Sequence, residues 1–310
     1  MYHHSQSGTA IITALFIMAL VTIMAVAMTT RLQIDIHRTQ LLLNFNKIYF
    51  KASGIKYWAI GKLLQDARQN EIVDDKPIID QTPKYFPMVN DNGVLLNGKL
   101  SDLQARFNIN NIIEPTYAKK FLQLLKIVAP DLTTLAALQI INGIEQHLLR
   151  GQSEQNSSFL SDINTPKRPV NPFVSISELR LIPGISAALL QQLSPYVTAL
   201  PEITPININT APLAVLRSLG NGLNAVQANS IINARKIKDG FKSIAEFTAA
   251  PNLSILNIPN ELITVTSNYF LSQANVTIPN QKLTLFTVIK RYVTKKSITI
   301  DVISETRNDI

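Results

Sequence analysis

The stretch TAIITALFIMALVTIMAVAMTT, from Thr9 to Thr30, decides the fold, and it contains no charged residue, no glycine and no proline. At a rise of 1.5 Å per residue it would form a helix of about 33 Å, enough to cross a bilayer core about 30 Å thick. A cleaved secretory signal and a buried core helix are the alternatives. The stretch is longer than a signal core, and no small-x-small site closes it. The sequence therefore predicts a retained membrane helix at 9–30.

The helical pattern continues beyond Arg31 along one face. Apolar residues recur there at alternating spacings of three and four, at Leu41, Phe45, Ile48, Ala52, Ile55, Ala59 and Leu63. No proline occurs before Pro77, although Gly54 and Gly61 each weaken a helix by up to about 1 kcal/mol. We expect 31–70 to extend the helix and to lie against a soluble domain.

Strand patterns follow the helix and return at the end of the chain. Asn97-Gly98 resembles a hairpin turn, and the next residues alternate between apolar and polar from Leu103 to Ile109, which predicts a half-buried strand. After Asn257 three strand-like segments follow, TVTSNYFLSQANVTI, KLTLFTVIKRYV and SITIDVIS. The sequence predicts an antiparallel sheet built from both ends of the soluble part.

Between these strands, from about Glu114 to Leu256, the apolar period is helical. Ser175 and Glu178 are spaced as a capping box, and Thr210 precedes Pro212 near the first turn of another helix. This region is predicted to be an all-helical module.

Composition excludes several classes of protein. The chain has 310 residues, 46% hydrophobic and 16% charged, as in a folded protein. It has no cysteine, which rules out disulfides, thiolate metal sites and cysteine nucleophiles. The formal charge of +8 is spread along the chain in runs no longer than a pair, which argues against a nucleic-acid surface.

No catalytic motif is visible. There is no phosphate loop, zinc signature, dinucleotide fingerprint or Ser–His–Asp order. His3 and His4 lie near the start, while His37 and His147 are isolated, and the single Trp58 on the long helix is best explained by packing. We assign no catalytic residue and expect no enzymatic activity.

The first residues resemble a type IV prepilin signal. Met1 to Gly8 is a short polar leader that ends in glycine, and Thr9 opens the apolar helix directly. The resemblance implies cleavage between Gly8 and Thr9 by a prepilin peptidase. The leader lacks Lys and Arg, unlike most such leaders, so topology depends on the resemblance more than on charge.

The fifth position after that bond is Thr13, where most pilins carry a glutamate. A carboxylate at that depth costs about 2.5–3.5 kcal/mol and is tolerated when it pairs with a neighbouring subunit's N-terminal amine. Two further segments are distinctive: LSDLQARFNINNII, from Leu100 to Ile113, and the pair SNYFL and LTLFTVIKR in the last strands. Together these features resemble protein K of the type II secretion system, a family of minor pseudopilins, over essentially the whole chain.

The resemblance implies an α+β pseudopilin fold, in which a long N-terminal helix packs on an antiparallel sheet that carries an inserted helical domain. That domain would be of the sterile-alpha-motif-like or helix-hairpin-helix type. The expected divisions are a leader at 1–8, a transmembrane helix at 9–30, a periplasmic half-helix at 31–70, sheet at 71–113, inserted domain at 114–256 and C-terminal strands at 257–310. The protein would sit in the bacterial inner membrane with its soluble domain in the periplasm.

The resemblance also implies a structural role at the tip of the secretion pseudopilus, where the chain initiates assembly. Minor pseudopilins I and J would be its partners, with H below them. Contact with the outer-membrane secretin or with secreted cargo stays open, as do the identity of that cargo and the face that meets each partner. Members often carry an acidic, calcium-binding run, but here Asn142 to His147 holds only Glu145, with Glu154 and Asp162 nearby. The resemblance leaves calcium binding open, and we assign no metal ligand and no cofactor.

A membrane-anchored DNA-binding protein of the competence type is the alternative function. Ile182-Pro183-Gly184-Ile185-Ser186 resembles a helix-hairpin-helix turn, but Ser186 replaces the second glycine, and Gly220-Asn221-Gly222 lacks the central apolar residue. Arg235, Lys236, Lys238 and Lys242 form a loose basic cluster that a solvated helix end also explains. A minor subunit of a type IV pilus is a third, weaker reading.

Overall fold

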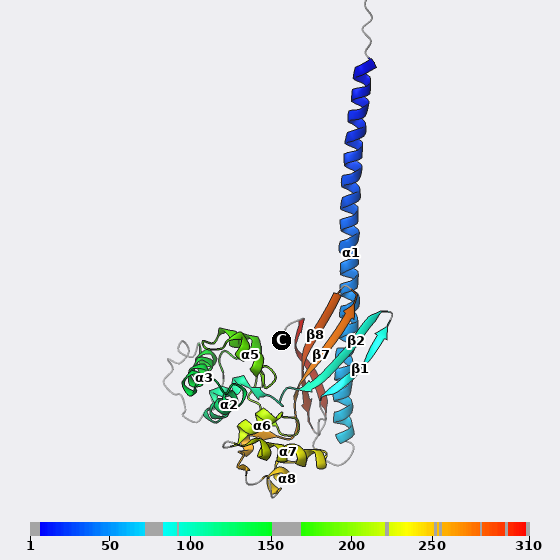
Figure 1. Cartoon of the computed structure of the whole chain (residues 1–310). Helices are drawn as coiled ribbons and strands as arrows, with labels where there is room; N and C mark the ends of the chain where they lie inside the picture. Colours follow the sequence, from blue (N-terminus) through cyan, green and yellow to red (C-terminus); the bar gives the residue numbers. More distant parts are fainter. Residues whose placement is uncertain are drawn as a thin grey trace, which may run out of the picture.

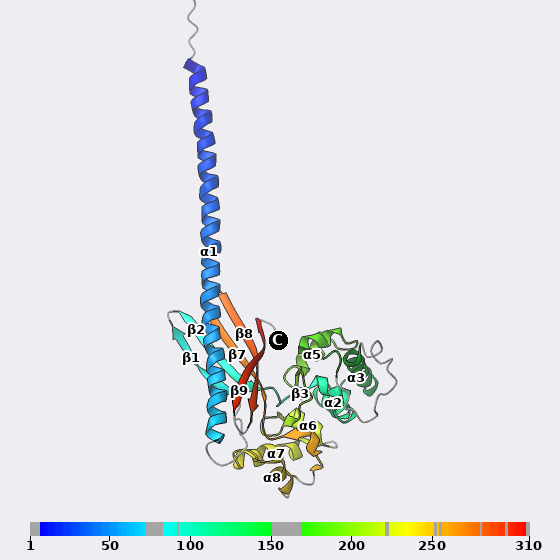
Figure 2. The same cartoon turned by 180° about the vertical axis from the view of Figure 1, so that it is seen from behind.

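The computed structural model describes residues 7–71, 83–91, 93–150, 169–220, 223–250, 253, 256–279, 281–294 and 297–307. It consists of a long helix, a five-stranded antiparallel sheet packed on the lower half of that helix, and a helical module beside the sheet (Figure 1). Seen from behind, the helix crosses one face of the sheet (Figure 2). The predicted α+β class, with a long apolar helix on an antiparallel sheet, is confirmed.

Helix α1 runs from Ser7 to Glu71. Every residue from Thr9 to Asn44 is exposed, and the most apolar part of the helix has a mean hydropathy of 2.7 with none of it buried. Within the part of the chain that the structure describes, α1 is the one helix long and apolar enough to span a membrane. A bare apolar surface of this size needs lipid or partner helices to cover it.

The lower half of α1 packs on the sheet through one apolar stripe. Ile48, Ala52, Ile55, Ala59 and Leu63 are buried, as predicted. Leu41 was expected to begin the stripe, but it is 40% exposed, because α1 first meets the sheet near Phe45.

The sheet has the strand order β1-β2-β7-β8-β9, with all neighbours antiparallel. Its strands are β1 Lys84–Asp91, β2 Val94–Asp102, β7 Tyr269–Ile278, β8 Gln281–Val293 and β9 Ile298–Arg307. β2 and β7 are neighbours, with Asp102 opposite Phe270, so the helical module is inserted between two adjacent strands. The three predicted C-terminal strands are confirmed.

The predicted turn at Asn97-Gly98 is wrong, because both residues lie inside β2, where Gly98 pairs with Ala274. The connection from β1 to β2 lies upstream at Gly93, whose φ of +78° favours glycine. Gly98 has a different role. A Cβ at this position would overlap the Ile55 methyl group Cγ2 and lie 3.2 Å from Phe86 Cβ, so the missing side chain lets α1 approach the sheet.

The half-buried strand predicted from Leu103 to Ile109 is also wrong. β2 ends at Asp102, and only β3, Phe107–Asn108, is extended before the 3-10 helix η1, Ile109–Ile113. The alternation misled because its polar members are buried too. Gln104 and Asn108 are 4% and 1% exposed, and their amides are hydrogen-bonded inside the molecule.

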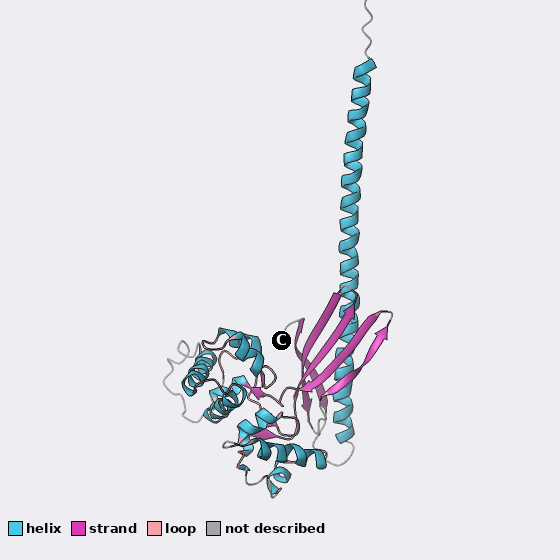
Figure 3. Cartoon of the chain, viewed as in Figure 1, coloured by secondary structure: helices cyan, strands magenta, loops and turns pink. Residues whose placement is uncertain are grey.

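The inserted module is mainly helical, and Figure 3 shows its helices separated from the strands of the sheet. Its helices are η1, α2 Pro115–Val128, α3 Thr134–Leu149, η2 Ile176–Leu181, α5 Ala187–Leu193, α6 Leu213–Leu219, α7 Ala225–Ile237, α8 Ile244–Ala249 and η4 Asn260–Leu262. It is not all-helical as predicted, because β3 pairs with β4 Val197–Thr198 and β5 Ile206–Asn207 pairs with β6 Ile263–Thr264, both in parallel.

The predicted helix starts have mixed outcomes. Ser175 and Glu178 do form a capping box, at the start of the 3-10 helix η2. Thr210 does not cap α6, whose N-cap is Pro212, because its hydroxyl is hydrogen-bonded to the buried carboxylate of Asp102.

One continuous hydrophobic core fills the module, from Phe107 to Val265. It extends several residues beyond 114–256 on both sides. We therefore propose that the module begins near Phe107 and ends near Val265, where its two short parallel strand pairs close it.

Candidate functional site

The N-terminal part of α1 is the first candidate region. α1 begins at Ser7, so the predicted cleavage bond between Gly8 and Thr9 lies in its first turn, while residues 1–6 of the leader lie outside the described residues. The Thr13 hydroxyl donates to the carbonyl oxygens of Thr9 (3.1 Å) and Ala10 (2.9 Å). Thr13 therefore brings neither a charge nor an unsatisfied donor into the apolar segment.

Polar contacts hold α1 on the edge of the sheet. Glu305 of β9 accepts hydrogen bonds from the hydroxyl of Tyr49 and the ammonium of Lys56, both at 2.8 Å. The guanidinium of Arg307 lies 4.8 Å from the centre of the Tyr49 ring. Burial alone would raise the pKa of Glu305, but the hydrogen bonds from Lys56 and Tyr49 lower it.

An open apolar groove of about 550 Å³ lies between α1 and the strands β1 and β2. We call it the α1 groove; it is lined by Lys47, Phe50, Lys51, Gly54, Ile55, Phe86 and Leu96. The Phe50 side chain is 81% exposed at this groove. An exposed aromatic side chain beside an apolar groove is typical of a protein contact surface.

A buried polar cluster joins the sheet to the module, and we call it the junction network. Its centre is Asp102, 3% exposed at the end of β2. The Asp102 carboxylate accepts hydrogen bonds from the Gln104 backbone N–H (2.7 Å), Asn207 Nδ2 (3.1 Å) and Ser267 Oγ (2.6 Å), and also from the Thr210 hydroxyl. Gln104 and Ser267 lie at the two ends of the insertion, and Asn207 and Thr210 lie in its middle, so Asp102 fixes where the module leaves and rejoins the sheet and also contacts its interior.

Three buried asparagines continue the junction network into the module. Asn108 Nδ2 donates to the Glu202 carbonyl at 2.8 Å, Asn110 Nδ2 to that of Leu200 at 2.8 Å, and Asn111 Nδ2 to that of Thr204 at 2.7 Å. Each binds the same loop after β4. The asparagines of the distinctive segment therefore act as structural ties rather than as ligands of a substrate.

Lys290 of β8 adds a second tie. Its ammonium pairs with the carboxylate of Glu202 and lies 5.0 Å and 4.5 Å from the ring centres of Tyr269 and Tyr292. Burial alone would lower the pKa of Lys290, but the hydrogen bond to Glu202 and the adjacent side chains of Tyr269 and Tyr292 raise it above its ordinary value. Sequence reasoning missed this pair and Asp102, because neither shows a local pattern.

The structure assigns structural roles to two of the four side chains in the basic cluster considered for DNA, Arg235 and Lys238. Arg235 donates to the carbonyls of Ile208 (2.8 Å) and Ala211 (2.9 Å), and burial lowers its pKa. Lys238 pairs with Glu246 at 3.0 Å, and the same carboxylate accepts the Lys242 backbone N–H. These residues stabilise helix ends, and Asn221 and Gly222 of the second hairpin lie outside the described residues.

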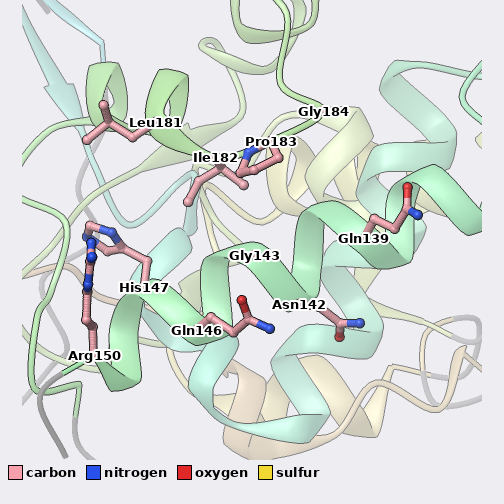
Figure 4. A pocket seen from close by; sticks show the side chains of 10 residues that line it. All are labelled: Gln139, Asn142, Gly143, Gln146, His147, Arg150, Leu181, Ile182, Pro183 and Gly184. Atoms are coloured by element: carbon pink, nitrogen blue, oxygen red, sulfur yellow. The ribbon is translucent and has the colours of Figure 1, made fainter.

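A second groove, of about 770 Å³, lies between α3 and the turn that follows η2 (Figure 4). We call it the α3 groove. Gln139, Asn142, Gly143, Gln146, His147 and Arg150 line it on one side, and Leu181, Ile182, Pro183 and Gly184 on the other. His147 stacks on Phe173 with 4.2 Å between the ring centres and lies 3.2 Å from Asn171 Nδ2, so it has a packing role.

The α3 groove covers much of the stretch where the family resemblance suggested calcium. Its lining has no carboxylate, and among the described residues no group of three or more His, Cys, Asp or Glu side chains could hold a metal. Glu154 and Asp162 lie outside the described residues.

Comparison with known proteins gives one family. Its models, described as "Type II secretion system (T2SS), protein K", match residues 105–202 and 206–266. The boundary between the two matches divides the helices of the module into two groups (Figure 1). The first group contains α2, α3 and α5, and the second contains α6, α7 and α8.

Curated relatives with the same name match over most of their length. The chain is 30% identical to type II secretion system protein K of Klebsiella pneumoniae, over 81% of both chains. It is 26% identical to the Pseudomonas aeruginosa protein over 92% of this chain and 89% of that one, and 26% identical to the Aeromonas hydrophila protein over 92% and 93%. These relatives do not support the DNA-binding alternative.

A solved structure shows the same fold. A chain in the crystal structure of the GspK-GspI-GspJ complex from the type 2 secretion system of enterotoxigenic Escherichia coli superposes with a TM-score of 0.63 at 21% identity. The match covers 88% of this chain and all of that one. The anchor helix, the inserted module, the family models and the relatives agree, and the chain belongs to the protein K family of the type II secretion system.

Proposed function

We propose that the chain is the minor pseudopilin at the tip of the type II secretion pseudopilus, where it initiates assembly for protein export across the outer membrane. One observation carries the proposal. The helical module lies beside the sheet and extends past the C-terminal end of α1, on the side away from the apolar anchor (Figures 1 and 2). Family membership and the bare apolar half of α1 support it.

The geometry gives a physical reason for the tip position. In a filament built on packed α1 helices, with the apolar anchors at the bottom, a subunit that lies above another must place its own helix alongside the helix of the subunit below it. A module that extends past the end of α1 occupies the space of a subunit above. Such a chain can accept neighbours below it and none above, so it starts the filament rather than lengthening it.

The N-terminal segment supports a membrane-stored precursor. Cleavage between Gly8 and Thr9 by a prepilin peptidase would leave the apolar helix on the mature chain. The chain would then cross the bacterial inner membrane once and hold its soluble part in the periplasm. Thr13, in place of the usual glutamate, suits a subunit without a neighbour above to pair with that charge.

The α1 groove is the proposed contact for minor pseudopilin I or J, with H below them. It continues the exposed face of α1 down to the edge of the sheet, and Phe50 stands in it 81% exposed. An apolar side chain of a partner helix would bury Phe50, and a partner carboxylate would pair with Lys47, since Lys51 already pairs with Asp91.

The experiment is to express the full chain with minor pseudopilins I and J, with and without an active prepilin peptidase. Intact mass should show loss of the first eight residues only with the peptidase, and the three proteins should purify together. An uncut N-terminus together with the absence of a complex would refute the proposal and leave the DNA-binding alternative to be tested by salt-dependent binding of duplex DNA.

A matched pair of variants tests the contact surface. Phe50→Glu should reduce recovery of I or J about tenfold or more, because a charge replaces an anchor residue. Val226→Glu on α7, equally exposed at 78% but outside the groove, should leave recovery unchanged. Equal recovery with both variants would show that the contact lies elsewhere.

A further inference from the structure

The α3 groove carries a row of free amides along one helix face. Gln139, Asn142 and Gln146 are spaced by three and four residues, so their side chains project from the same side of α3, and Figure 4 shows Asn142 and Gln146 pointing the same way. None of the three makes a side-chain hydrogen bond to another described residue. Each carboxamide offers both a donor and an acceptor to the groove.

The opposite wall is apolar. The Leu181 side chain is 71% exposed, and Ile182 and Pro183 follow it along the groove. Gly143 brings the walls close together, because a Cβ there would lie 2.9 Å from Ile182 Cγ2. The groove thus offers hydrogen bonds on one side and an apolar surface on the other.

The groove carries charge at one end only. Arg150, exposed at the C-terminal end of α3, is the single charged residue in the lining that the structure describes, and its side chain makes no ion pair with a described residue. A ligand in the groove would therefore be uncharged along its length and carry one carboxylate at the Arg150 end.

Other classes of ligand match this lining less well. Nucleic acid needs several cations along its backbone, and the lining has one. Glycans are usually held on an open aromatic face, and the one aromatic ring of the lining, that of His147, is stacked on Phe173. A divalent cation would need carboxylates, which the lining lacks.

We infer that the α3 groove binds an extended polypeptide segment of another protein. The backbone N–H and C=O groups of that segment pair with the amides of Gln139, Asn142 and Gln146, and its apolar side chains face Leu181 and Pro183. A carboxylate of the segment pairs with Arg150. Because amides recognise backbone groups that every peptide carries, binding depends little on side-chain sequence.

The test uses the full chain in detergent micelles and fluorescence anisotropy. The probe is a fluorescein-labelled, C-terminally amidated octapeptide, Ala-Val-Ser-Val-Ala-Val-Ser-Asp. Two matched peptides accompany it: one with Lys in place of Asp, and one with alternate backbone nitrogens methylated. The first should bind, and the other two should bind about tenfold more weakly, because one has lost the carboxylate and the other its N–H donors.

Variants assign the binding to the groove. The triple change Gln139→Ala, Asn142→Ala and Gln146→Ala should weaken binding of the Asp peptide about tenfold or more. Arg150→Glu should reverse the preference between the Asp and Lys peptides. Gln191→Ala with Gln192→Ala removes two exposed amides of α5 outside the groove and should change nothing.

The outcomes separate the hypotheses. The proposal is overturned if the Asp peptide does not bind, if the methylated peptide binds equally well, or if the α3 and α5 variants behave alike. Binding of an N-acetylglucosamine oligomer in the groove in place of the peptide would assign it to a glycan and also refute the proposal. Arg150→Glu should still purify with I and J, so this result is independent of the tip assignment.

Discussion

Asp102 is the residue on which the connection between sheet and module most depends. Its buried carboxylate accepts hydrogen bonds from Gln104 and Ser267, at the two ends of the insertion, and from Asn207 in its middle. Asp102→Asn keeps the shape but replaces one acceptor by a donor that faces other donors. We expect a loss of about 2–4 kcal/mol in the free energy of unfolding, measured by thermal denaturation followed by circular dichroism.

Asp91→Asn provides the comparison, since that carboxylate pairs with Lys51 at the surface. Its melting temperature should stay close to that of the parent chain. If Asp102→Asn were equally mild, the junction network would not hold the module in place.

Glu305 gives a pH-dependent prediction at the same scale. Its pKa is lower in the folded chain than the ordinary value of 4.5, so its contribution to stability is complete above that value and is lost as the pH falls through the folded-state pKa. Glu305→Gln should be less stable than the parent at neutral pH. The difference should shrink as the pH drops below about 4.5.

Melting temperatures of both proteins between about pH 3 and 7 measure this. The combined change with Lys56→Met should be less than additive at neutral pH, because both side chains belong to one ion pair. A constant gap between Glu305→Gln and the parent at all pH values would contradict the assigned role.

At the scale of the element, the packing of α1 on β2 depends on Gly98. Gly98→Ala places a methyl group against Ile55 Cγ2, which the branched side chain holds rigidly near the helix backbone. We expect a loss of about 1–3 kcal/mol in the free energy of unfolding. Chemical denaturation of the chain in micelles measures this loss.

Gly61→Ala makes the same change on the open side of α1, where nothing lies within 4 Å. It should stabilise the chain by up to about 1 kcal/mol, because alanine favours a helix. Similar effects from both substitutions would mean that Gly98 is not a close-contact site.

The helix α1 and the strands of the sheet show which parts of the fold could be predicted from the sequence. The α1 stripe and the strand β8 were predictable because one face of each is buried and the other exposed, so apolar residues recur with the period of a helix or a strand. β9 has no buried residue and was predictable from its β-branched residues instead. The segment after Asp102 was not, because Gln104, Asn108 and Asn110 are buried through hydrogen bonds to loops far along the chain. A local pattern cannot reveal a polar residue whose partner lies 63 to 101 residues away.

The two grooves illustrate a further limit. Phe50 and Leu181 carry no motif, and they become candidates only when the fold shows that they stay exposed beside a hollow. The membrane segment needed no such help, because its length and lack of charge are sufficient.

At the scale of the whole molecule, the module is an insertion that the sheet could exist without. Asp102 and Phe270 face each other on β2 and β7, so a short glycine-rich turn could replace residues 103–268. We expect this shortened chain to keep a folded sheet on α1, seen as strand signal and a cooperative melt in circular dichroism. Under the proposed function, the shortened chain should also be incorporated below the tip, measured as the number of pseudopili that carry it below their ends.

A matched variant keeps the module but replaces Phe107 and Phe121, which are both buried in its core, with alanine. This double variant should have an unfolded module and should keep the strand signal of the sheet in circular dichroism. Loss of the whole melt in both variants would show that sheet and module fold as one unit.

The placement of the insertion also favours one order of folding, in which the module forms before the sheet is complete. β1 and β2 precede the module in the chain, yet the strand that pairs with β2 to extend their sheet is β7, which follows the entire module. A pairing at that separation is slow when the intervening chain is loose, and an open β2 edge invites wrong partners meanwhile. The module can form first, from nearer contacts, and then bring Ser267 to Asp102. The module proposed to end the filament would thus first act as the scaffold on which its own subunit finishes folding.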